Sequence, residues 1–71
     1  MKGQYKLICY LNGREVKRFF NVKSIHFDKK YNYWVLTECI YNHDIITVHR
    51  LCEFDKIVII DKEGIRKELT L

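Results

Sequence analysis

The sequence predicts an all-β fold, a small barrel or SH3-like roll of six to seven short antiparallel strands. The chain has no Ala and no Pro but many β-branched and aromatic residues, which favour strands over helices. Apolar and polar side chains alternate over short segments, and turn sequences recur about every ten residues. With 71 residues, the chain is expected to form a single domain, residues 1–71, with a thin core.

The N-terminal third predicts a β-hairpin. Residues 5–11 alternate, Asn12-Gly13 supplies the positive φ angles of a type I′ turn, and residues 14–20 form the return strand. A simple two-residue turn would place Arg18 opposite Leu7, on the apolar face. Two solutions are open: a β-bulge that shifts the register, or an arginine that extends past the sheet edge.

A second hairpin is expected from residues 22 to 41. Residues 24–27 form a short strand, Asp28-Lys29-Lys30 a polar turn, and residues 31–41 a long strand. Both faces of this long strand carry apolar residues, which indicates a central strand between two cores or a bent barrel strand.

The C-terminal third predicts further short strands with one ambiguous end. Residues 65–71 alternate like a strand, but their Glu, Lys, Arg and Leu content also allows a short helix from Glu63. The other expected elements are a turn at 42–44, a strand at 45–49, a helical turn or tight corner at 50–54, a strand at 56–60 and a turn at 61–64.

The expected core follows from the apolar face of each predicted strand. Its members are Leu7, Cys9, Val16, Phe20, Ile25, Phe27, Val35, Leu36, Ile46, Val48, Val58, Ile60 and Leu69.

Composition argues against several functional classes. The chain has no Gly-rich phosphate-binding motif, and its size leaves little room for a substrate pocket of several hundred Å3. We therefore expect no enzyme activity, no cofactor and no small-molecule substrate. No apolar run reaches the roughly 20 residues of a membrane span, and no signal-peptide pattern follows the N-terminus. A cytoplasmic protein with reduced thiols and no membrane partner is expected.

The cysteines and histidines suggest two sites that we consider and do not favour. Cys39, His43, His49 and Cys52 form a C-x3-H-x5-H-x2-C pattern, but zinc modules usually contain paired C-x2-C ligands. Cys52 with His49 and Glu53 has the residue types of a nucleophilic triad, although such partners normally come from separate elements. We expect no catalytic and no metal-binding residues.

A basic and aromatic segment is the candidate binding site. Lys29, Lys30, Tyr31, Tyr33 and Trp34 interleave cations with rings, and the net charge of the chain is +4. Single-strand nucleic-acid binders combine cations that contact phosphates with rings that stack on bases. If nucleic acid binds here, Tyr31 and Tyr33 must be exposed beside Lys29, Lys30 and another basic strand.

The favoured function is a non-enzymatic binding module that acts through a protein partner or a homodimer. Ten aromatics exceed what a thin core easily buries, and aromatics are enriched at interfaces. Residues 2–11 and 65–71 are the expected edge strands for pairing. The Ile- and Lys-rich, Ala-free composition suggests an AT-rich genome, so we expect an accessory protein of a low-GC bacterium or its phage.

Overall fold

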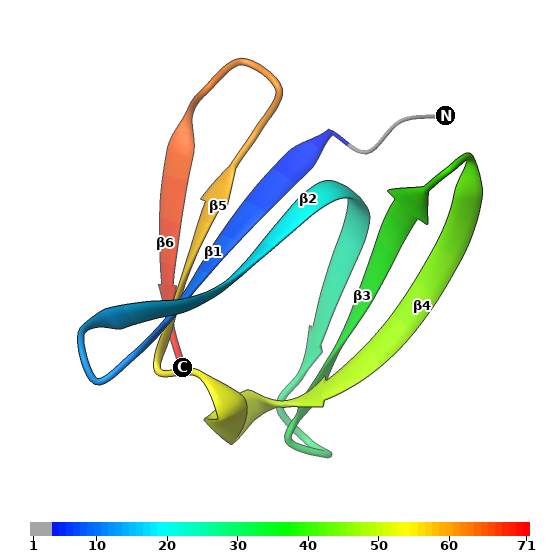
Figure 1. Ribbon diagram of the computed structural model, residues 1–71. Helices are drawn as coiled ribbons and strands as arrows, with labels where there is room; N and C mark the ends of the chain where they lie inside the picture. Colours follow the sequence, from blue (N-terminus) through cyan, green and yellow to red (C-terminus); the bar gives the residue numbers. More distant parts are fainter. Residues whose placement is uncertain (1–3) are drawn as a thin grey trace.

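The protein is an all-β structure of six antiparallel strands in one sheet, as the sequence predicts (Figure 1). The structure is a computed structural model, and it describes residues 4–71. The strands follow the order β4-β3-β2-β1-β5-β6 across the sheet. The elements are β1 (Tyr5–Leu11), β2 (Arg14–Asp28), β3 (Tyr33–Ile40), β4 (His43–Arg50), the 3-10 helix η1 (Leu51–Glu53), β5 (Lys56–Ile60) and β6 (Arg66–Thr70).

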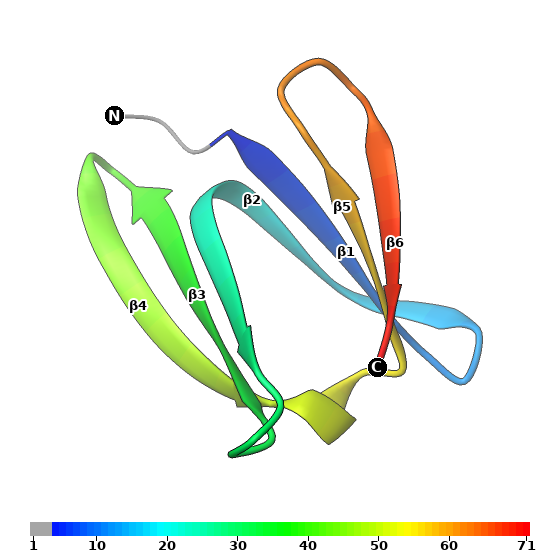
Figure 2. The ribbon, with the colours of Figure 1, turned by 180° about the vertical axis from the view of Figure 1, so that it is seen from behind.

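The sheet is bent but not closed. β2 is 15 residues long; its first half pairs with β1 and its second half with β3. The sheet folds along this strand, so that β1, β5 and β6 face β3 and β4 (Figures 1 and 2). Closure into a barrel or SH3-like roll is not confirmed, because β4 and β6 remain as its two edges.

The first hairpin is confirmed, and a β-bulge sets its register. Asn12 and Gly13 have φ angles of 54° and 78°, as a type I′ turn requires. Cys9 pairs with Lys17 and Tyr10 with Glu15, which leaves Val16 as the extra residue. The bulge moves Lys17, Arg18 and Phe19 by one position relative to a simple hairpin, so that Arg18 lies opposite Ile8 and not opposite Leu7.

β2 continues through the region where a break between two strands was expected. Tyr5 pairs with Val22 and Leu7 with Phe19, so the strand contains a second irregularity. Asn21 lies within it and has a φ of 55°. A bulge increases local bend and twist, which lets one strand serve both halves of the sheet.

The later turns differ in detail from the expected ones. β4 begins at His43 because Tyr41 and Asn42, both with positive φ, form a two-residue turn. The expected helical turn is present as η1. Residues 66–70 form a strand and not a helix, since β6 pairs with β5 over its whole length. The first residues of the edge strand expected at 2–11 lie outside the described residues, and β1 itself is central, with β2 and β5 beside it.

The core lies on the concave face of the bent sheet. Four expected members, Val16, Phe20, Ile46 and Val48, are instead exposed. Val16 is the bulge residue, and the shifted register buries Phe19 in place of Phe20. Ile46 and Val48 lie on the outer face of an edge strand. The observed core cluster is Leu7, Cys9, Phe19, Val22, Trp34, Leu36, Phe54 and Ile57.

Ile57→Val should lower the free energy of unfolding by about 0.5–1.5 kcal/mol, because Ile57 is 0% exposed and a buried methylene is lost. The matched control is Ile65→Val, which removes the same methylene from a side chain that is 61% exposed and should change stability by less than about 0.5 kcal/mol. Urea unfolding followed by tryptophan fluorescence measures both. Equal effects would contradict the assignment of the core.

Candidate functional site

Trp34, one of the five expected binding residues, belongs to the core and not to a surface. Its side chain is 0% exposed, and its indole Nε1 donates a hydrogen bond to the Arg50 carbonyl at 3.2 Å. Successive strand residues point to opposite faces, so Trp34 turns inward where Tyr33 turns outward. The prediction of Trp34 as a stacking platform is therefore wrong.

The other four expected residues come together at the turn between β2 and β3. Tyr31 is 64% exposed, the Lys30 Nζ lies 5.3 Å from its ring centroid, and the Tyr33 ring lies 6.3 Å away. Tyr33 is only half-exposed, so Tyr31 alone meets the requirement that both rings be exposed. Lys29 is also exposed. Asp28 holds the turn, since its carboxylate accepts hydrogen bonds from the backbone N–H groups of Lys30 and Tyr31.

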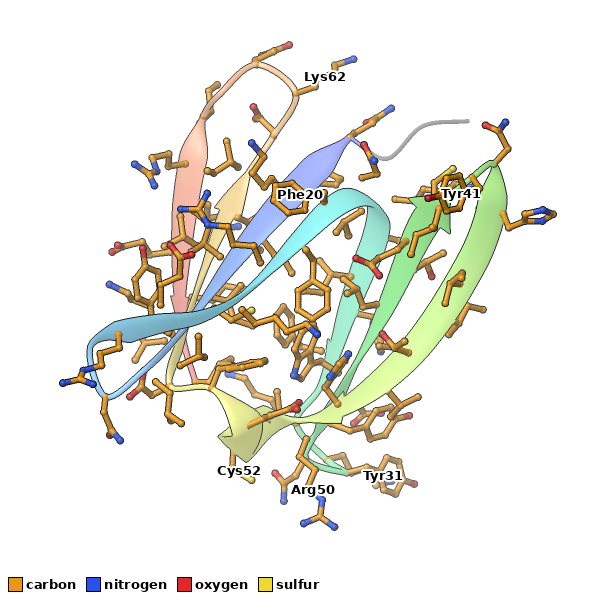
Figure 3. All side chains as sticks on the ribbon, in the orientation of Figure 1. Phe20, Tyr31, Tyr41, Arg50, Cys52 and Lys62 are labelled. Carbon is orange, nitrogen blue, oxygen red and sulfur yellow. The ribbon has the colours of Figure 1, made fainter. Side chains whose placement is uncertain are left out.

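One further cation joins this cluster from a neighbouring strand. Arg50 pairs with Tyr33 across β3 and β4, and it lies at the same end of the molecule as Tyr31 (Figure 3). We call Lys29, Lys30, Tyr31, Tyr33 and Arg50 the basic–aromatic cluster. Sequence spacing could not reveal Arg50, because its proximity depends on the pairing of β3 with β4.

An open groove lies beside this cluster. Its volume is about 780 Å3, larger than the sequence led us to expect. Apolar side chains from three segments, in β2, around η1 and at the C-terminal end, form most of its wall. The lining residues are Phe27, Lys29, Asn32, Leu51, Cys52, Phe54, Asp55, Leu69, Thr70 and Leu71.

The four residues of the candidate zinc pattern do not converge. His43 begins β4, His49 lies near its end, and Cys52 follows in η1. Cys39 lies in β3 opposite Asp44. Within residues 4–71, no three His, Cys, Asp or Glu side chains form a metal-binding group.

His49 has a different set of partners from those the sequence suggested. Its Nε2 lies 2.9 Å from the Thr47 hydroxyl, and its Nδ1 lies 3.0 Å from the Glu53 carboxylate. Its ring stacks on Trp34 with centroids 4.4 Å apart. Cys52 is not among these partners, so the Cys–His–Glu grouping that we considered and did not favour is not formed, and the contacts link Thr47, His49 and Glu53 instead. The contacts with Thr47 and Glu53 fix the imidazole of His49 over Trp34 and connect β4 to η1.

β4 is an edge strand with apolar side chains on both faces. Ile46 and Val48 are each 67% exposed on its outer face, and Ile45 is exposed on the other. Between Asp44 and His49 the strand has no ionisable residue. Such an edge offers unpaired backbone groups together with an apolar surface. Ile46 and Val48 are expected in the core from alternation alone, which gives no sign of this surface.

The opposite edge is different in character. β6 presents Arg66, Lys67 and Glu68, all exposed. Charged side chains along an edge oppose the addition of another strand, because pairing would desolvate them. Of the two edges, β4 is therefore the one suited to pairing.

Comparison with known protein families, with curated proteins and with solved structures found no match to this chain. Over residues 4–71, none of the helical structure is long and apolar enough to cross a membrane.

The three cysteines are free and differ in accessibility. Cys9 and Cys39 are buried, whereas Cys52 is exposed in η1. Burial, reinforced by the charge of Glu53, raises the pKa of the Cys9 thiol from 9.0 to about 12. Because the raised value belongs to the folded state, neutral Cys9 favours folding below pH 9, and this stabilisation is lost as the pH rises toward 12.

Iodoacetamide at pH 8 should modify Cys52 rapidly in the native protein and leave Cys9 and Cys39 intact, because iodoacetamide reacts only with thiolates that are accessible to it. All three should react in denaturant. Mass spectrometry of intact and digested protein measures the sites. Rapid native modification of Cys9 would show that β1 does not bury this thiol as described.

Proposed function

We propose that this protein is a non-enzymatic binding module, and that it binds by adding a strand from another protein chain to β4. One observation carries the proposal: β4 is an open edge whose exposed isoleucines and valine are not interrupted by charge. In strand addition, backbone hydrogen bonds supply affinity and alternate side chains supply specificity.

The surroundings of β4 support this role. The strand is fixed at both ends, through the Tyr41-Asn42 turn and through the contact of the Leu51 N–H with the Asn32 carbonyl at 3.0 Å. A preformed edge loses little conformational freedom on pairing. We infer a module that acts without a cofactor or metal. Its three free thiols fit a reducing compartment such as the cytoplasm, and the proposed origin in a low-GC bacterium or its phage rests on composition alone.

Binding of single-stranded nucleic acid is the second candidate, and the exposure of Tyr31 favours it. The basic–aromatic cluster combines an open tyrosine ring with Lys30 above it and with Arg50 nearby. Stacking of a base on such a ring contributes about 1–3 kcal/mol. The cluster occupies the end of the molecule and leaves the middle of β4 free, so the two candidates can be tested separately.

Ile46→Lys should weaken any β4-dependent association by at least about tenfold, since a cation would have to be desolvated at the centre of the paired edge. We would measure the self-association of purified protein by sedimentation, and the co-purification of partners from cells that express tagged variants.

The matched control is Ile65→Lys, because Ile65 is exposed to a similar extent, 61%, but lies in the turn before β6. Circular dichroism checks that both variants fold. Association that resists Ile46→Lys, or association lost equally in both variants, would contradict the proposal.

Lys29→Glu/Lys30→Glu should abolish binding of labelled single-stranded DNA or RNA if the basic–aromatic cluster is a nucleic-acid site. Lys62→Glu/Lys67→Glu makes the same change in net charge in and beside the β5–β6 turn, away from the cluster (Figure 3), and should leave most of the affinity intact. Fluorescence anisotropy at about 50 and 200 mM salt gives both affinities. Equal losses would indicate nonspecific attraction by net charge.

A further inference from the structure

We infer that β4 pairs with β4 of a second copy, antiparallel and in the register centred on Thr47, to form a twofold-symmetric dimer with one continuous sheet. This inference rests on the proposed function of the β4 edge and names its partner. A twofold dimer requires a self-complementary surface. Each residue of β4 must therefore be compatible with the β4 residue of the second copy that lies opposite it.

The alternation of β4 limits the registers that are allowed. Asp44, Ile46, Val48 and Arg50 share one face of β4 by alternation. It is the face opposite His49, which stacks on Trp34 in the core. Opposite residues of a continuous sheet point to the same face. The twofold axis must therefore lie where one residue of β4 faces the same residue of the second copy, and not midway between two neighbouring residues of β4.

Charge and apolar contact select among these registers. Centred on Thr47, the pairing places Asp44 opposite Arg50 of the second copy and Ile46 opposite Val48. Both contacts occur twice by symmetry. A pairing centred on Ile46 would place Asp44 opposite Val48. A pairing centred on Val48 would place Ile46 opposite Arg50. The Thr47 register alone matches charge with charge and apolar with apolar along the outer face.

The backbone groups of β4 are compatible with this pairing. Ile40 and His43 flank a two-residue turn with positive φ angles and so form a hydrogen-bonded pair. By alternation from that pair, Ile46 and Val48 direct their N–H and C=O groups toward the open edge. In the Thr47 register these two residues lie opposite one another, as a hydrogen-bonded pair of the new ladder requires.

Asp44 and Arg50 are both available to form the ion pair that the dimer requires. Arg50 takes part in no ion pair within residues 4–71. Asp44 binds Lys23 at 2.9 Å, and its side chain remains 50% exposed. A carboxylate accepts several hydrogen bonds, so Asp44 can hold Lys23 and the incoming guanidinium together.

Cysteine cross-linking tests the register directly. At the dimer axis, the two Thr47 positions form a non-hydrogen-bonded pair with Cα atoms about 4.5 Å apart, within the range of a disulfide. Thr47→Cys and Ile46→Cys are each made in a Cys52→Ser background, which leaves only the buried cysteines beside the new one. Both proteins are oxidised with diamide and separated on a non-reducing gel, after circular dichroism has confirmed folding.

We expect Thr47→Cys to give covalent dimer at least fivefold faster than Ile46→Cys. Arg50→Asp should weaken the wild-type dimer by about tenfold in sedimentation, whereas Arg66→Asp, the same change on β6, should not. Ile46→Lys should give a monomer.

Each outcome separates this inference from the proposed function. Faster cross-linking of Ile46→Cys, with a dimer that Ile46→Lys disrupts, overturns the register and leaves β4 as a binding edge. A monomer at every concentration, together with partners lost in Ile46→Lys, overturns the dimer and keeps the proposed function. A dimer that resists Ile46→Lys overturns both.

Discussion

The burial of Trp34 is the interaction on which the rest of the structure depends. Its indole lies among Phe19 and Phe27 of β2, His49 of β4 and Phe54 beyond η1, with ring centroids between 4.4 and 6.1 Å away. A chain of this size buries a limited apolar area, so one large side chain supplies a substantial part of its core. The bent sheet is the arrangement that surrounds this ring.

The bend is built into β2. The bulge at Val16 directs Phe19 into the core, and the irregularity at Asn21 lets the same strand continue to Phe27, which pairs with Trp34 across β2 and β3. Phe27 and His49 are cross-strand neighbours of Trp34 and stack on it within the sheet, but Phe19 and Phe54 come from beyond these strands and reach the indole because the sheet bends. The bend therefore replaces a second layer, and it does so without closing the sheet.

An open sheet leaves two edges, and the side chains on the two edges differ in this protein. β6 has charged side chains, whereas the centre of β4 has isoleucine, threonine and valine. The same strand provides Thr47 and His49, which bind each other and support Trp34. The edge that is free to bind is thus held in shape by the core, which connects the stability of this small fold to its proposed function.

The sequence by itself determined the strand content, the Asn12-Gly13 turn and the strand at 56–60, because alternation and positive-φ residues act locally. It places Tyr31 at the start of a strand, whereas the turn after Asp28 extends through Asn32. It could not determine that Trp34 is core or that Ile46 and Val48 are exposed. These outcomes depend on the β2 bulges and on which strand ends the sheet. A one-residue shift exchanges the two faces, and an edge has no local signal, so only the tertiary structure decided them.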